Sequence, residues 1–304
     1  MKGTRFLFVG ILLLLLSFFM KPVFADPPKE TGSWELTFEE NFDSPQLDES
    51  KWFPGYRLGR LEYYKRIGFP NEHGRGWPQP PLAHYVIENG IIKLRVTETL
   101  PKRAAVDAPC VCGLTSYIYR YNEKSGKFDD HIKFSQKYGW FEMRCRVPAG
   151  SGFYSAFWLH QVGAEFQEFS PEGLFQRKSG VVEIDIFEWL GKKVKSGYNE
   201  FNVHFAPGKG WYDFNSGVDG SKDFHTWAID WQEGQITWYF DGKQVRVYKG
   251  PTPPRQMYLL MALFYRGFPS QANWLGPLSP DTKYPIDFEI DYVRVWKRAS
   301  GQGK

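Results

Sequence analysis

The stretch VVEIDIFEWLG, residues 181–191, places three carboxylates inside a run that is otherwise apolar. Isoleucine, valine and aromatic residues with a glycine at each end predict a β-strand covered on both faces. An unpaired carboxylate inside such a strand costs free energy. Glu183, Asp185 and Glu188 therefore indicate that one face of the strand lines a cleft.

The spacing of the three carboxylates predicts an irregular strand. Side chains alternate between the two faces, so Glu183 and Asp185 share a face, whereas Glu188 should point away. A β-bulge around Ile186 and Phe187 would return Glu188 to the side of Glu183, and bulges do occur beside active sites. Two glutamates about 5 Å apart suit retaining glycoside hydrolysis, in which one attacks and the other serves as acid and then base. Asp185 would orient the nucleophile.

A solvated edge strand with an acidic face is the alternative explanation for these carboxylates. The residues that flank them are Ile184, Ile186, Phe187 and Trp189, which are not typical of a solvated edge. The apolar flanks favour the cleft.

EIDIFEWLG resembles the catalytic strand of glycoside hydrolase family 16, in the bulged form of its laminarinase-like and agarase-like branches. TSYIYRYNEKSGKF and YGWFEMRCRVPAGSGFYSAFWLH resemble the two strands before it, and HTWAIDWQEGQITWYFDGKQV and IDYVRVW resemble the closing strands. The resemblance runs from about Trp34 to Trp296. It implies an all-β fold: a β-jelly-roll sandwich of two antiparallel sheets with a concave substrate cleft. It also implies that Glu183 is the nucleophile, Asp185 its helper and Glu188 the acid/base.

Further residues are predicted to contact the substrate. They are Tyr154, Trp158, Trp189, Asn202 and His204. Tyr154 and Ser155 stand where many laminarinases have a tryptophan and a proline, which leaves the substrate open. Asn202 and His204 are two residues apart and so share a face, and the resemblance puts His204 on the leaving-group side. A tryptophan on a buried strand is as often a core residue, and a lone strand histidine is often structural.

The sequence thus predicts a retaining endo-β-glycanase that hydrolyses a β-1,3- or β-1,4-linked polysaccharide, with β-glucan as first choice. The alternatives are a galactanase acting on agar, porphyran or carrageenan, a transglycosylase, and an inactive carbohydrate-binding module. Binding alone needs no acid and nucleophile on one strand, so the three carboxylates argue against the module.

The N-terminus has the pattern of a secretory signal peptide over residues 1–25. Lys2 and Arg5 precede an apolar run over 6–20, and small residues lie near Ala25. A membrane anchor is the alternative, but a run of about 15 residues is short for a span of roughly 20. We expect an exported protein, extracellular or periplasmic, with no later membrane span and one catalytic domain over residues 26–304.

Charge and cysteine content exclude several kinds of partner and site. A formal net charge of +4 does not indicate nucleic-acid binding. Basic and aromatic residues interleave over residues 56–77, either as a solvated loop or as a cleft wall that attracts an acidic polysaccharide. Cys110 and Cys112, in a loop-like stretch, and Cys145, in a predicted strand, allow one disulfide at most. Their spacing does not fit a zinc site.

No cofactor is expected for catalysis, and the polysaccharide is the expected partner of a monomer. The resemblance implies a structural calcium ion on the face away from the cleft, at positions matching Glu40, Gly90 and Asp291. Oxygen ligands of this kind suit calcium.

Alternation of apolar and polar residues predicts the flanking strands. A strand is expected over 34–42, a hairpin over 85–97 around Asn89-Gly90, and a second hairpin over 236–248 around Asp241-Gly242. Residues 58–82 lack periodicity and are interpreted as a long functional loop.

Overall fold

The computed structural model describes residues 27–28, 31–54, 84–97, 110–122, 124–125, 127–163, 182–204, 210–265 and 272–299. The expected signal peptide, the interleaved region 56–77 and the predicted loop 58–82 lie outside these ranges. Among the described residues, no helix is both long enough and apolar enough to cross a membrane.

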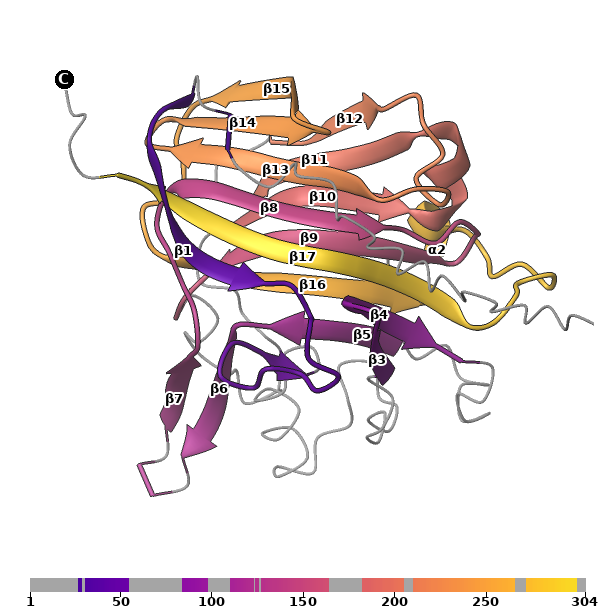
Figure 1. Ribbon diagram of the computed structural model, residues 1–304, viewed down its shortest axis with the longest axis horizontal. Helices are drawn as coiled ribbons and strands as arrows, with labels where there is room; N and C mark the ends of the chain where they lie inside the picture. Colours follow the sequence, from indigo (N-terminus) through magenta and orange to yellow (C-terminus); the bar gives the residue numbers. More distant parts are fainter. Residues whose placement is uncertain are drawn as a thin grey trace, which may run out of the picture.

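Strands make up nearly all of the regular structure in these ranges (Figure 1). They are β1 (Trp34–Glu40), β2 (Phe53–Pro54), β3 (His84–Glu88), β4 (Ile91–Val96), β5 (Cys110–Thr115), β6 (Tyr117–Asn122), β7 (Lys127–Ile132), β8 (Gly139–Arg146), β9 (Phe153–Gln161), β10 (Glu183–Leu190), β11 (Tyr198–His204), β12 (Tyr212–Asn215), β13 (His225–Gln232), β14 (Gln235–Phe240), β15 (Lys243–Lys249), β16 (Met257–Tyr265) and β17 (Ile286–Arg298). The helical turns are η3 (Gly191–Ser196) and α2 (Ala272–Leu275).

Two antiparallel sheets are stacked face to face in a jelly-roll sandwich (Figure 1). In the described part of the chain, the first sheet has the order β15-β14-β13-β8-β17-β4-β3, with β1 also paired to β17. The second has the order β12-β11-β10-β9-β16-β5-β2. The predicted jelly-roll fold is therefore confirmed, and the carboxylate-bearing strand β10 lies in the interior of the second sheet.

The space between the sheets is filled by apolar side chains from alternate strand positions. On β10 these include Ile184 and Phe187, and on β13 and β14 they include Trp227 and Trp238, all of them fully buried. Burying a large apolar side chain stabilises a fold by about 1.5–3 kcal/mol. A separate apolar cluster, which includes Tyr154 and Trp158 of β9, lies on the other face of the second sheet.

Both predicted hairpins are present, with the predicted turns. Asn89 and Gly90 connect β3 to β4 with φ of 55° and 70°, and Asp241 and Gly242 connect β14 to β15 with φ of 47° and 72°. A two-residue type I′ turn requires positive φ at both central residues, which asparagine, aspartate and glycine tolerate best.

The prediction of a loop around Cys110 and Cys112 was wrong, because both residues belong to β5, which pairs with β16. Cys112 is buried and its thiol lies 3.1 Å from the carbonyl oxygen of Arg95. Cys145 lies in β8 of the opposite sheet, where burial raises the pKa of its thiol well above the usual value. Both thiols act as core packing groups.

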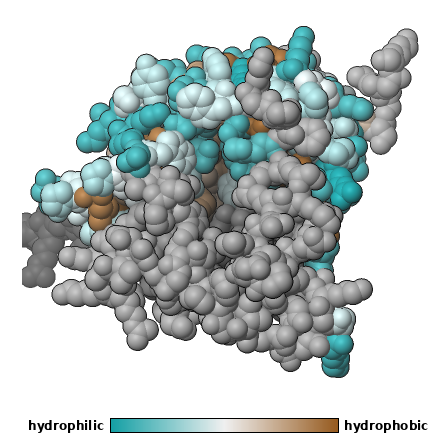
Figure 2. All heavy atoms as spheres, turned by 180° about the vertical axis from the view of Figure 1, so that it is seen from behind, coloured by the Kyte–Doolittle hydropathy of each residue, from teal (hydrophilic) through white to brown (hydrophobic). Residues whose placement is uncertain are grey.

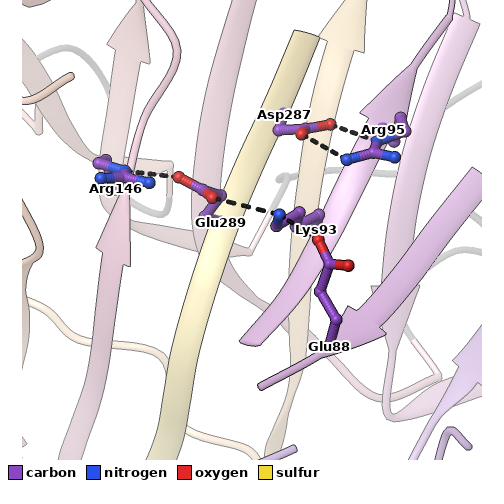
Figure 3. Close-up of polar contacts among 6 residues, drawn as sticks. All are labelled: Glu88, Lys93, Arg95, Arg146, Asp287 and Glu289. Carbon is purple, nitrogen blue, oxygen red and sulfur yellow. Dashed lines mark hydrogen bonds and ion pairs between the residues drawn. The ribbon is translucent and has the colours of Figure 1, made fainter. Parts of the chain in front are cut away.

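Ion pairs cross the outward face of the first sheet, and we call them the outer ladder (Figure 3). Arg146 of β8 pairs with Glu289 of β17, and Glu289 lies 3.9 Å from Lys93 of β4. Lys93 also binds Glu88 at the end of β3. Next to this row of ion pairs, Arg95 donates two hydrogen bonds of 2.8 Å to Asp287.

Candidate active site

Strand β10 contains the bulge that the odd spacing of its carboxylates predicts. Against β9, Asp185 pairs with Trp158 and Phe187 pairs with Phe157, so Ile186 has no opposite residue. The register against β11 shifts in the same interval. An extra residue in one strand bends it and re-aims the side chains that follow.

The bulge puts all three carboxylates on one face of the second sheet. Ile186 and Phe187 both point into the core between the sheets, so the alternation of side chains is interrupted by one residue. Glu188 therefore points to the opposite face, as Glu183 and Asp185 do. Asp185 is almost fully buried on that face, and Glu183 and Glu188 are half-buried.

A tryptophan of the other sheet supports the bulge from behind. The indole nitrogen of Trp238, on β14, donates a 3.1 Å hydrogen bond to the main-chain carbonyl oxygen of Asp185. A bulge disrupts the ladder locally, and a buried carbonyl without a partner is costly. This bond therefore stabilises the main chain at the point where the strand is irregular.

Cross-strand pairing gives each carboxylate one neighbour on β9 and one on β11. Glu183 lies between His160 and His204, Asp185 between Trp158 and Asn202, and Glu188 between Ala156 and Glu200. The site is thus three rows of side chains on a rigid sheet. Viewed from behind Figure 1, the described surface is mostly hydrophilic with smaller apolar areas between (Figure 2).

His204 contacts two of the carboxylates, as its position on the same face requires. Its Nε2 atom lies 3.0 Å from Oδ2 of Asp185 and 3.5 Å from Oε1 of Glu183. The side-chain nitrogen of Asn202 lies 3.0 Å from the same ring atom. Potential ligand atoms of Glu183, Asp185 and His204 fall within 4.8 Å of one another, a spacing that a small cation also accepts.

The two carboxylates nearest the bulge have raised pKa values. Burial, with a smaller contribution from Glu183, raises the pKa of Asp185 to about 7, while His204 opposes the rise. Burial also raises the pKa of Glu188 well above its ordinary value, and the neighbouring Asp185, Glu183 and Glu200 add to the rise. A carboxylic acid that keeps its proton at neutral pH can act as a general acid.

The family model described as glycosyl hydrolases family 16 matches residues 103–278, which include all of this site. The chain belongs to glycosyl hydrolase family 16. It is thereby placed among the glycoside hydrolases, as the carboxylates of its central strand indicate.

Relatives and solved structures of family 16 agree with this placement. The chain is 27% identical to the glucan endo-1,3-beta-glucosidase A1 of Niallia circulans over 86% of its own length and 38% of the relative's. It is 29% identical to a beta-glucanase of Fibrobacter succinogenes, over 69% of the chain and 57% of the relative. It therefore spans less than two thirds of either relative.

The fold matches solved structures at lower identity. A laminarinase catalytic domain from Thermotoga petrophila has a TM-score of 0.60 at 22% identity, with 88% of this chain and 99% of that one covered. A GlcNAcα1-4Gal-releasing endo-β-galactosidase from Clostridium perfringens has a TM-score of 0.65 at 22% identity, with 92% and 67% covered. Both likenesses show the fold.

A fourth carboxylate of this family 16 site was not predicted from the sequence. Glu200 of β11 is 2% exposed. Its Oε1 accepts a 2.8 Å hydrogen bond from Lys193, and its Oε2 accepts bonds of 3.0 Å from Trp274 and 3.3 Å from Trp211. The signal was present in NEFNVHF, because Glu200 precedes Asn202 by two residues and so shares its face.

Two of the predicted aromatic neighbours lie on the carboxylate face. Trp158 is the cross-strand partner of Asp185, and Tyr154 stacks on Phe264 with ring centroids 4.3 Å apart and 3° between the planes. Tyr154 also meets Trp274 edge-on at 4.8 Å. Both predicted side chains are 5% exposed or less, so they form an apolar floor under the site.

Trp189 does not lie where the sequence analysis placed it. It follows Glu188 directly and therefore points to the other face, into the core between the sheets. It is 1% exposed and meets Trp227 edge-on at 5.8 Å. A methyl group at Gly220 would approach its ring to 2.3 Å, which shows how closely it is enclosed. Trp189 is a core residue, and the prediction of a substrate contact was wrong.

Residues predicted to bind calcium lie on β17 itself or beside strands that pair with it. Glu40 pairs with Val293, and Gly90 precedes the strand whose Ile92 pairs with Ile290, next to Asp291. A second set of contacts gives both carboxylates cationic neighbours. Lys51 lies 3.7 Å from Oε2 of Glu40, and Arg144 donates a 2.5 Å hydrogen bond to Asp291.

Proposed function

We propose that the protein is a secreted retaining endo-β-glycanase that hydrolyses β-1,3- or β-1,4-linked glucan by double displacement. The observation that carries the proposal is the bulge in β10, which brings Glu183 and Glu188 to one face with Asp185 between them. The names of the relatives, a glucan endo-1,3-beta-glucosidase and a beta-glucanase, support β-glucan as the substrate.

Two glutamates would share the two displacements. In the first, a carboxylate oxygen of Glu183 attacks the anomeric carbon while Glu188 gives its proton to the glycosidic oxygen, which leaves as a hydroxyl. In the second, Glu188 takes a proton from water as the water oxygen attacks the same carbon. Glu183 then departs as a carboxylate, and Glu188 has regained its proton. The raised pKa of Glu188 suits it to begin the cycle as an acid.

Asp185 and His204 would control the charge beside the nucleophile. With its pKa near 7, Asp185 can be neutral when Glu183 is ionised, which limits the repulsion between them. His204 reaches both carboxylates and is 40% exposed in its side chain, so it can exchange protons with water. This arrangement keeps one negative charge available for attack.

The anomeric configuration of the first product tests the mechanism. Proton NMR during cleavage of laminarin or lichenan should show the β-anomer first, before mutarotation. A first product of inverted configuration would exclude double displacement and the roles assigned to the two glutamates.

A substrate panel tests the choice of polysaccharide. Release of reducing ends should be fastest on laminarin or lichenan and slow on agarose, porphyran and carrageenan. Activity confined to the galactans would reverse this order. New, longer products formed when a sugar acceptor is added would instead identify a transglycosylase.

Export and monomeric state are further parts of the proposal. The positive N-terminal residues followed by an apolar run support cleavage after about residue 25. N-terminal sequencing of the protein recovered from the medium or periplasm should begin near that point. Light scattering should give the mass of one chain.

A structural calcium ion near β17 would compete with Lys51 and Arg144, which adjoin the carboxylates of Glu40 and Asp291. An ion that binds the folded state alone raises the melting temperature. Adding a chelator should therefore lower the melting temperature of the protein, and added calcium should restore it. An unchanged melting temperature would exclude the ion.

A further inference from the structure

Glu200 faces the acid/base residue of the proposed function directly. In the register of β10 and β11, Glu188 and Glu200 are partners, and both side chains lie on the carboxylate face of the second sheet. Directly opposite residues in an antiparallel pair have Cβ atoms about 4.5–5.5 Å apart. Like charges at this distance repel, more so where the groups are removed from water.

The contacts of Glu200 keep its carboxylate in one place. Lys193 binds one oxygen, and the indole nitrogens of Trp211 and Trp274 bind the other. All three groups can only donate, so both carboxylate oxygens of Glu200 act as acceptors. With 2% of the residue exposed, Glu200 has little access to solvent that would screen its charge.

The charged neighbours of Glu188 are mostly negative in the described part of the chain. Glu183 and Asp185 lie on its own strand, and Glu200 lies opposite on β11. On the β9 side the opposite residue is Ala156, which is uncharged. A cation, Lys193 of η3, binds Glu200 and lies 3.6 Å from Asp213 of β12.

We propose that Glu200 is a positioning residue of the hydrolytic reaction, whose fixed negative charge holds the catalytic proton on Glu188 until the leaving oxygen takes it. The inference rests on the proposed function. It assigns Lys193 the opposite influence, because its positive charge offsets part of the charge of Glu200. Trp211 and Trp274 hold the carboxylate in register with Glu188.

The same charge acts in both displacements. Once Glu188 has given up its proton, two carboxylates face each other, which makes Glu188 a stronger base toward the incoming water. Glu200 is assigned no bond to the sugar, so its effect is confined to the affinity of Glu188 for a proton.

Removing the charge while keeping the shape is the first experiment. In Glu200→Gln the alkaline limb of the pH profile of kcat/KM should move about 1 to 2 pH units lower. A ¹³C-carboxyl NMR titration of Glu188 should shift in the same direction, and this readout needs no turnover. An unmoved titration would overturn the proposal.

A variant of Lys193 should shift the alkaline limb in the opposite direction, and a variant of Asp213 should leave it unchanged. Lys193→Met should move the alkaline limb to higher pH, because Glu200 loses its cation. Asp213→Asn is the matched control: it removes a carboxylate from the same lysine, but one that is 41% exposed, and should leave the limb in place. Equal shifts of the alkaline limb in Lys193→Met and Asp213→Asn would contradict the proposed role of Glu200.

Failure of this inference differs from failure of the proposed function. A wild-type enzyme that releases the β-anomer first, with a Glu188 titration identical in wild type and Glu200→Gln, would refute only the role of Glu200. A wild-type protein that cleaves no β-glycan would refute the proposed function, whatever the titration shows. If Glu200→Gln does not fold, the direction of the shift in Lys193→Met decides.

Discussion

The carboxylate face of the second sheet and the outward face of the first sheet surround their carboxylates with charges of opposite sign. On the carboxylate face, Glu188 has carboxylates beside it, and burial together with these neighbours raises its pKa. In the outer ladder, each carboxylate has a cation beside it (Figure 3). The hydrogen bond that Lys93 donates to Glu88 lowers the pKa of Glu88, and the one that Arg146 donates to Glu289 raises the pKa of Arg146.

This difference separates a structural charge from a functional one. The outer ladder places a cation beside each carboxylate, so every charge in it is neutralised locally. The carboxylate face brings like charges together, which costs stability and raises the pKa values of Asp185 and Glu188. The unfavourable arrangement is therefore the better guide to the reaction.

Glu183→Ala should cause the largest loss of activity. Without the attacking oxygen the covalent path cannot proceed, so turnover should be abolished while circular dichroism shows an intact fold. Added azide should restore some cleavage of a substrate with an activated leaving group. Substantial activity without azide would contradict the role of Glu183.

Glu188→Ala should have an effect that depends on the leaving group. General acid catalysis contributes about 10²–10⁴-fold, and a good leaving group departs with little need of a proton. Hydrolysis of the polysaccharide should fall by about this factor, whereas an activated aryl glycoside should lose much less. Equal losses on both substrates would argue against an acid at this position.

Asp185→Asn should cause a smaller loss of activity than Glu183→Ala and should alter the pH dependence of stability. The folded pKa of Asp185, about 7, exceeds the ordinary value of 3.8, so the folded state binds this proton more tightly than the unfolded state. Stability from this group is complete at acid pH and is lost as pH rises toward 7. The variant should therefore show a flatter melting temperature between about pH 4 and 7. An identical slope would mean that Asp185 does not titrate in this range.

Glu289→Gln should have the smallest effect, because it removes one charge from the outer ladder. Partly exposed ion pairs contribute about 0–1 kcal/mol, so we expect a loss of about 1 kcal/mol or less in the free energy of unfolding. High salt should reduce the difference from wild type, and kcat/KM should be unchanged. A marked loss of activity would mean that the two faces are coupled.

Local sequence signals predicted the features that depend on a single strand or turn. The odd interval between Asp185 and Glu188 predicted the bulge, and the Asn-Gly and Asp-Gly pairs predicted both hairpins. Glu200 was missed because its importance comes from pairing with β10. The sequence of a strand does not tell which other strand it pairs with. Cys112 was misplaced because a glycine and nearby prolines conceal a strand that tertiary pairing stabilises.

The hydrogen bond from Trp238 to the main chain of Asp185 has a consequence for the tolerance of this enzyme to substitution. A bulge adds one residue to a strand. If it moved along β10, the side chains between its old and new positions would turn to the opposite face of the sheet. The hydrogen bond from Trp238, in the core between the sheets, fixes the bulge at the carbonyl of Asp185. Replacing this core residue by phenylalanine would keep an aromatic ring between the sheets but remove the N–H that makes this hydrogen bond. The distance between the two glutamates is thus set partly by a side chain that no sugar can reach.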